Sequence, residues 1–231
     1  GAVQWGVSAS TTSGELATVS TTTASTAISQ FAEENMIPAF YKGMSEKYMD
    51  MIPYVYNYKK SPDQGIKSFL ETPRYSSGYA AVFVCFSFIT EAHVYKPFEK
   101  RVMHTLVFLE TLIGYTSVNT SQIQRKRKEA KELTTAQKEF VLEWEIDTTQ
   151  FEELPFNGYS TEVRKSKLTE QEMIFYNRKQ PFSQSIKYYN SFRPKLSVNK
   201  PSFYVVPQAY EEIVERMRWN GVELRSLQND S

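Results

Sequence analysis

The sequence has few of the residues that most often build catalytic and metal sites. Its one cysteine, Cys85, excludes a disulfide within the chain. Its two histidines, His93 and His104, occur in no HExxH, CxxC or similar spacing, so we expect no metal site made wholly within this chain. A GxSxG elbow, a GxxxxGK(S/T) phosphate loop and a Rossmann fingerprint are also missing, which removes the commonest motif-based assignments.

Excess charge of one sign and long apolar runs are missing as well. The 27 basic and 26 acidic residues nearly cancel, so no nucleic-acid partner is expected. No segment approaches the roughly 18 apolar residues of a membrane span. Aromatic residues are abundant, with 15 Tyr and 15 Phe, which indicates a β-rich part or an aromatic-lined binding surface. The chain starts at Gly1 without a signal sequence, and we expect it to be an excised part of a longer protein.

The most distinctive stretch is Ala80–Glu91, AAVFVCFSFITE, which follows Pro73–Tyr79 and ends on a carboxylate. Its length and its aromatic and β-branched residues predict a strand covered on both faces, in the centre of an α/β sheet. Glu91 would then lie where open α/β sheets bind ligands, and burial there would raise its pKa toward that of a general acid or base. Alternatively, Glu91 is structural and only leads into the helix that Pro97 begins.

Around this stretch the N-terminal half predicts further elements. Gly6–Thr26 is rich in Ser and Thr and is expected to be a flexible surface segment. Ala27–Tyr48 predicts one kinked helix or two short ones, and Met51–Tyr58 a short edge strand. An amphipathic helix is expected to start at Pro97 and end at Gly114. Its predicted apolar stripe consists of Phe98, Val102, Leu106, Leu109 and Ile113.

The C-terminal half predicts a β-rich layer with one covering helix. Phe140–Ile146 alternates, with Phe140, Leu142, Trp144 and Ile146 on one face, as a half-exposed strand does. Further strands are expected at Tyr159–Lys165, Ser185–Tyr189, Lys195–Val198 and Ser202–Val206. Pro207 is expected to open a helix with a buried stripe of Ile213, Val214 and Met217 and a C-cap at Asn220–Gly221. We therefore expect half of an α/β domain at 1–118, a charged helical linker at 119–138 and a β-rich accessory domain at 139–231.

Three ordered segments carry a family resemblance. TPRYSSGYAA, the apolar run and TEAHVYKPFEKRV together resemble the end of the catalytic domain of funnelin-type zinc carboxypeptidases, above all those of Bacteroidetes-type bacteria. Lys200–Leu224 resembles the end of their accessory β domain, and NMIPAFYKGMSEKYMDMIPYVYN is similar to the same group. The resemblance implies a mixed α+β fold, with a partial carboxypeptidase-like α/β sheet followed by a small β-rich domain with a C-terminal helix.

The resemblance also implies roles for particular residues. The family uses a glutamate near the end of the catalytic domain as general base and later as general acid, and TEAH aligns that residue with Glu91. A mobile tyrosine before the same strand contacts the terminal carboxylate of the peptide substrate; Tyr75 is the first choice and Tyr79 the second. Independently of the resemblance, Arg74 beside Tyr75 could bind a carboxylate there, although a single arginine next to a proline is more often an ordinary surface residue.

The chain departs from the family pattern at the metal. The family holds one zinc with an HxxE pair and a later His, but no HxxE occurs here, and neither His93 nor His104 lies where the third ligand would fall. The start, AVQWG, resembles the segment just after that third His. We therefore expect zinc in the parent protein, with its ligands upstream, and none in this chain.

Two functional readings follow. In the first, the parent is a secreted or periplasmic zinc metallocarboxypeptidase that hydrolyses C-terminal residues of peptides, and this chain alone is inactive. In the alternative, the chain is a non-catalytic, degenerate carboxypeptidase-like module that binds peptide, glycan or a partner protein. Loss of the upstream half is expected to leave a sheet edge open and to allow a homo-oligomer through it.

Overall fold

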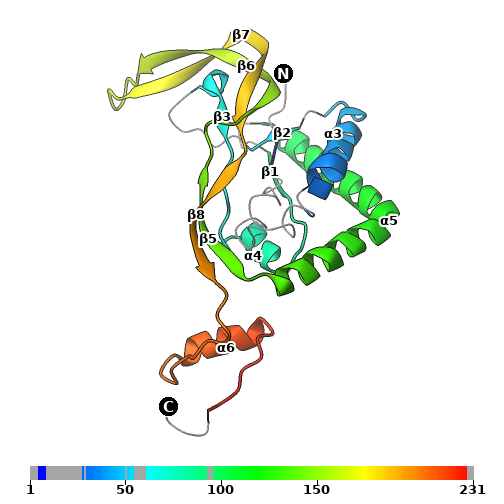
Figure 1. Ribbon diagram of the computed structural model, residues 1–231. Coiled ribbons are helices and arrows are strands. Elements are labelled where there is room, and N and C mark those ends of the chain that lie inside the picture. Colours follow the sequence, from blue (N-terminus) through cyan, green and yellow to red (C-terminus); the bar gives the residue numbers. More distant parts are fainter. Residues whose placement is uncertain are drawn as a thin grey trace. The chain divides into compact units, whose positions relative to one another are not determined.

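A computed structural model describes residues 5–8, 28, 30–49, 51–54, 61–92 and 96–227 (Figure 1). Helices and β-strands both contribute substantially, so the fold is mixed α+β, as the sequence predicts. The chain divides into two units, Gly1–Asn199 and Lys200–Ser231, which are described separately. Among the described residues no helix is both long and apolar enough to cross a membrane.

The main core of the first unit lies between the helical segments. The π-helical turn η1 (Ala32–Met36) continues into α3 (Ile37–Ser45), which packs against the long helix α5 (Phe98–Ala136). The change from π-helix to α-helix occurs just before Pro38, in agreement with the predicted interruption there. The ring of Phe40 is the centre of this core; its centroid lies 5.1 Å from that of Phe88 and 5.7 Å from that of Phe108.

Helix α5 differs from its prediction in length and in its buried face. It continues past Gly114 through the predicted linker to Ala136, because this single glycine does not end the helix. Its core face carries His104, Val107 and Phe108, and the predicted stripe faces outward. A Cβ on Gly43 of α3 would lie only 2.5 Å from Thr111 Cγ2, so this glycine lets α3 approach the Val107–Thr111 face closely. Periodicity shows that a helix is amphipathic, but here α3 decides which apolar face is covered.

The predicted strand at Ala80–Glu91 is wrong over most of its length. Ser76–Val82 forms helix α4, residues 85–88 belong to no helix or strand, and only Ile89–Ala92 forms a strand, β4. Small residues favour the helix here: Gly78 and Ala81 are buried and let α4 pack closely, and alanine is the best helix former. Val82 and Phe83 are 45% and 43% exposed, so this run is not covered on both faces.

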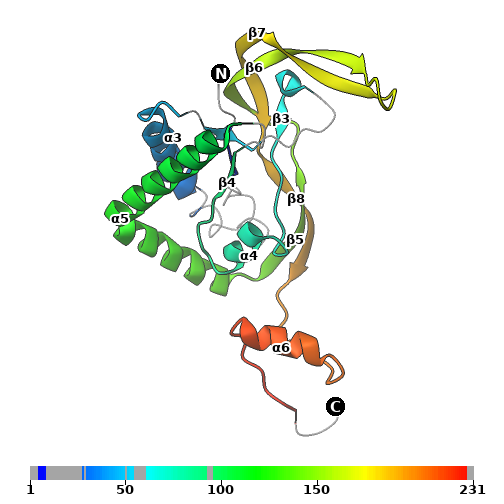
Figure 2. The same ribbon diagram turned by 180° about the vertical axis from the view of Figure 1, so that it is seen from behind.

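The sheet that contains β4 has three described strands in the order β2-β1-β4. Strand β1 (Trp5–Ser8) lies in the middle, parallel to β2 (Ile52–Pro53) and antiparallel to β4. Figure 2 shows β4 in the view from behind. The predicted edge strand at Met51–Tyr58 is confirmed where it is described, at β2. Among the described strands β4 also lies at an edge and not in the predicted central position. Most of Gly6–Thr26 lies outside the described residues.

The β-rich part of the first unit contains two strand pairs. Strand β5 (Glu139–Ile146) pairs with β8 (Phe192–Asn199), and the long hairpin β6 (Glu152–Lys165) and β7 (Glu172–Tyr189) carries the short parallel strand β3 (Ile66–Lys67) on one edge (Figure 1). The strands predicted between 140 and 198 all lie within these elements and are confirmed. One face assignment is wrong: a bulge between Val141 and Glu143 buries Val141 and leaves Leu142 58% exposed.

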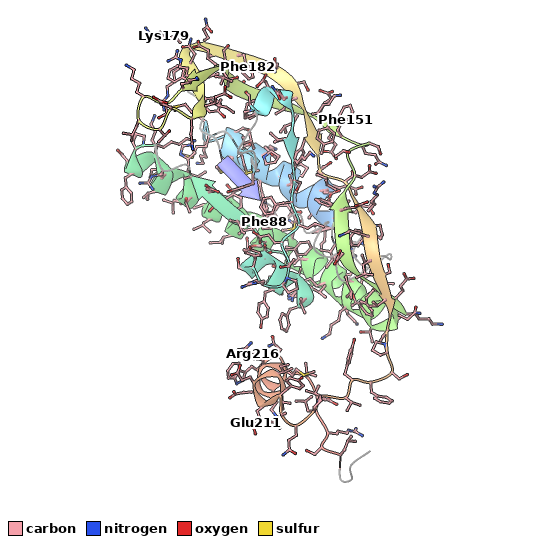
Figure 3. All side chains as sticks on the ribbon, turned by 90° about the vertical axis from the view of Figure 1, so that its left-hand side faces the viewer. Phe88, Phe151, Lys179, Phe182, Glu211 and Arg216 are labelled. Atoms are coloured by element: carbon pink, nitrogen blue, oxygen red, sulfur yellow. The ribbon has the colours of Figure 1, made fainter. Side chains whose placement is uncertain are left out.

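The second unit contains one helix, α6 (Glu211–Trp219), from which Glu211 and Arg216 project (Figure 3). The predicted strand Ser202–Val206 is wrong, since these residues form no strand and Tyr204 is 77% exposed. The predicted buried stripe is also wrong, because α6 has no buried residue. By itself this short unit has no second layer to cover the helix. The predicted C-cap is confirmed at Gly221, whose φ of 75° suits glycine.

Candidate functional site

Glu91 lies on β4 and its side chain is exposed. The antiparallel register places Gly6 of β1 opposite Glu91, and Trp5 opposite Ala92. The predicted burial of Glu91 at the mouth of a covered sheet is therefore wrong, because β4 is an edge strand with solvent beside its carboxylate. An exposed carboxylate next to a glycine on the neighbouring strand is accessible to a ligand.

Arg74, Tyr75 and Tyr79 lie together at the start of α4. The backbone N–H of Tyr75 donates to the carbonyl of Thr72, and Tyr75 precedes the first residue of the helix. Tyr75 and Tyr79 are four residues apart, so they share one side of the first helical turn. Tyr75 is 58% exposed, Arg74 is exposed, and the Tyr79 ring meets the Phe83 ring edge-on at 5.2 Å. Glu91 belongs to a separate element, β4, which follows α4 after six residues.

The connection from α4 to β4 is fixed by a residue that sequence reasoning missed. Val84 adopts a left-handed conformation with φ 54°. Arg127 of α5 donates from Nε to the Val84 carbonyl at 2.7 Å and from Nη2 to Cys85 Sγ at 3.0 Å. The sequence predicts only a charged helical linker around Arg127, and a partner 43 residues away leaves no local signal. Arg127 therefore holds the start of the segment that leads to Glu91.

Glu71 is a second residue that the sequence did not single out. It lies just before the turn that carries Arg74 and Tyr75, and its Oε2 is buried with no hydrogen-bond partner among the described residues. Burial raises the pKa of the Glu71 carboxyl above its ordinary value, although the backbone N–H of Ser77 donates to the carboxylate and lowers the pKa in part. The ionised form is therefore disfavoured in the folded chain.

This raised pKa predicts a pH-dependent effect of Glu71→Gln. A carboxyl whose pKa is higher in the folded state adds stability below its ordinary pKa, and that stability is lost as the pH rises through the folded-state value. The glutamine side chain resembles the neutral form, so we expect the variant to unfold at a higher temperature than wild type at about pH 7 and at the same temperature near pH 3. Thermal unfolding at both pH values measures this; an equal change at both values would rule out the titration of Glu71 as its cause.

The histidines do not build a zinc site within the described residues. His104 is buried on α5, and its Nδ1 donates to the Lys100 carbonyl at 2.6 Å. His93 lies outside the described residues. No group of three or more His, Cys, Asp or Glu side chains able to hold a metal occurs in the described part of the chain. The residues present therefore do not fit the zinc that the family resemblance implies.

We predict that the purified 231-residue chain binds no tightly held zinc. After incubation with zinc and desalting, we expect fewer than about 0.1 zinc ions per chain, because a stable site needs three or four convergent ligands. Elemental analysis by mass spectrometry gives the ratio. One zinc per chain that disappears in His93→Ala or His104→Ala would contradict the prediction.

In comparisons with known proteins, no family model, no curated protein and no solved structure matches the chain. The candidate residues are one accessible carboxylate on β4 and, on a separate turn that precedes β4 in the sequence, two exposed tyrosines and an arginine. Such a set can move a proton at Glu91 and can bind an anionic group at Arg74.

Proposed function

We propose that this chain is the C-terminal portion of a zinc metallocarboxypeptidase that hydrolyses C-terminal residues of peptides, with Glu91 as general base and general acid. The proposal rests on the resemblance of the TPRYSSGY and TEAH segments and on one observation: Glu91 is exposed, and the strand beside it carries Gly6 at the opposing position. A catalytic carboxylate has to be accessible to water and substrate, whereas a purely structural one has no such need.

The strand pairing gives further support. Because β1 and β4 are antiparallel, the chain enters β1 at the end of the sheet where β4 finishes, next to Ala92. The N-terminal end of β1 therefore lies beside the Glu91 end of β4. The proposal assigns the zinc ligands to residues upstream of the chain.

In the proposed reaction Glu91 moves one proton. Its carboxylate accepts the proton of the attacking water at one oxygen and then donates this proton to the nitrogen of the leaving amine. Proton transfer of this kind contributes about 10² to 10⁴-fold to the rate. An exposed position is compatible with this role once the bound peptide excludes solvent.

The residues on α4 would bind the substrate. A peptide that is cut at its C-terminus presents a free carboxylate, and a guanidinium pairs with a carboxylate through two parallel hydrogen bonds. Arg74 is suited to that contact, and the Tyr75 or Tyr79 hydroxyl can donate a further hydrogen bond. The exposure of Tyr75 favours it over Tyr79, whose ring already packs on Phe83.

The alternative function is a non-catalytic module that binds peptide, glycan or a partner protein. The exposed Tyr75 and Tyr79 side chains favour it, because aromatic rings on a surface are typical of recognition sites. Under either function we propose a secreted or periplasmic protein, because the resemblance is to proteins of those compartments.

Assay of the full-length protein separates these functions. It is incubated with one peptide that ends in a free carboxylate and with the same peptide amidated at its C-terminus, and the released amino acid is measured. A carboxypeptidase releases the terminal residue from the first peptide only. Binding of the first peptide without release supports the module; no release and no binding contradict both.

The open edge of β4 predicts self-association of the isolated chain. Among the described strands β4 pairs only with β1, and an edge strand without a second partner is a template for pairing with another chain. We expect the molar mass measured by light scattering to rise with concentration. A monomer at all concentrations would contradict this expectation.

A further inference from the structure

The segment Tyr79–Thr90, YAAVFVCFSFIT, contains no glycine, proline or charged residue. Its aromatic and β-branched residues favour a strand, and it contains none of the residues that usually interrupt one. In the structure, however, only Ile89–Ala92 is a strand, whereas Ser76–Val82 is helix α4. Uncharged segments with this composition pair with identical copies of themselves when the fold does not restrain them. The contacts that keep Phe83–Phe88 out of a strand are therefore important for the behaviour of the chain.

Helix α4 ends at a valine in a backbone conformation that suits glycine. The N–H of Val84 donates to the Ala81 carbonyl at 2.9 Å, and the N–H of Cys85 donates to the Ala80 carbonyl at 3.1 Å. These two bonds form the Schellman pattern of helix ends, in which Val84 occupies the position that is most often glycine. Its φ of 54° is a genuine outlier for a β-branched residue. Such a conformation is strained, so contacts elsewhere in the structure have to offset its cost.

Arg127 of α5 makes such a contact. Its Nε donates to the Val84 carbonyl at 2.7 Å, and its Nη2 donates to Cys85 Sγ at 3.0 Å. Almost one helical turn further along α5, Ala130 is buried in the same apolar cluster as the Val84 side chain. A hydrogen bond from a guanidinium is stronger than one between neutral groups. Helix α5 therefore holds Val84 through both its carbonyl and its side chain.

We propose that Arg127 is a conformational gatekeeper, whose hydrogen bond to the Val84 carbonyl limits pairing of Phe83–Thr90 as a strand with the same segment of a second copy of the chain. Phe86 and Phe88 both pack against the main core, as alternate residues of a strand would. The largest backbone change needed to extend β4 backwards therefore lies at Val84. The partner is a second copy because an uncharged segment meets no repulsion from an identical one. This role of Arg127 does not depend on any catalytic role of Glu91.

The test compares Arg127→Ala with Arg125→Ala in the 231-residue chain. Arg125 is exposed on the same helix, and its removal changes the net charge by the same amount. Assembly is followed by thioflavin T fluorescence, and the protease-resistant core of the product is identified by peptide mass spectrometry. For Arg127→Ala we expect assembly at least about tenfold faster than for wild type, because a charge-assisted hydrogen bond is lost, with Phe83–Thr90 in the resistant core. For Arg125→Ala we expect the wild-type rate.

A Val84→Gly background separates this role from a general loss of stability. Glycine adopts the left-handed conformation without help, so in this background we expect Arg127→Ala to speed assembly less than about threefold. If Arg127 only stabilised the fold, its loss would have the same effect in both backgrounds. An equal effect in both backgrounds, a wild-type rate for Arg127→Ala, or a resistant core outside Phe83–Thr90 would each overturn the proposal.

Discussion

Replacing Gly78 by alanine is expected to lower the free energy of unfolding by about 3 kcal/mol or more. A Cβ at this position would lie 2.2 Å from the Thr72 carbonyl oxygen and 2.5 Å from the Glu71 carbonyl oxygen. Both neighbours are backbone atoms, which cannot move aside as the end of a flexible side chain does. Alanine would therefore push α4 away from the turn that carries Arg74 and Tyr75.

Gly114→Ala is the matched control for Gly78→Ala. Gly114 also lies in a helix, α5, but a Cβ there meets nothing within 4 Å. Alanine at position 114 is expected to stabilise the chain by about 0.5–1 kcal/mol, because glycine is a poor helix former. Urea unfolding of both variants measures the difference. Equal stability of the two variants would show that α4 does not pack on the turn at Thr72.

Local patterns predicted the β-rich part of the chain well. The alternation in Phe140–Ile146 is resolved as β5, and the shorter predicted strands fall within β6, β7 and β8. Alternation is a property of adjacent residues, so it can be read without knowing the partner strand. The bulge at Leu142 was not predicted, because a register shift depends on the partner strand β8.

Features set by distant partners were not predictable. Ala80–Glu91 contains the residues of a strand, yet its first part forms α4, where Gly78 packs on the backbone at Thr72. The buried face of α5 is likewise decided by α3 at Gly43 and not by periodicity. In both cases tertiary packing overrides local preference.

The candidate site was predicted in part. Glu91 was named from its place at the end of the apolar run, and Arg74, Tyr75 and Tyr79 from the segment just before that run; the roles given to them stay predictions. The roles of Glu71 and Arg127 could not be predicted from the sequence. The role of Glu71 depends on its burial, and that of Arg127 depends on a contact with a residue 43 positions away. Their contribution becomes visible only in three dimensions.

Glu91→Gln in the full-length protein is expected to lower kcat by about 10² to 10⁴-fold. Glutamine has nearly the same shape as glutamate but accepts no proton from water, so the variant loses the proton transfer and keeps the fold. KM is expected to change little, because substrate contacts are assigned to Arg74 and Tyr75. Zinc content is expected to stay unchanged, since Glu91 is not proposed as a ligand.

Glu110→Gln serves as the control for this variant. Glu110 is an exposed carboxylate on α5 and not on β4. Removing its charge changes the net charge of the protein by the same amount as Glu91→Gln does. We expect its kcat to equal that of wild type, so a loss confined to position 91 reports chemistry and not surface charge.

The most direct test of the proposed role of Glu91 is therefore the kcat of full-length Glu91→Gln for release of a C-terminal residue, measured together with its zinc content. We predict a loss of at least about 100-fold with the same zinc content as wild type. Unchanged turnover at full zinc content would contradict this prediction and would remove Glu91 from the mechanism.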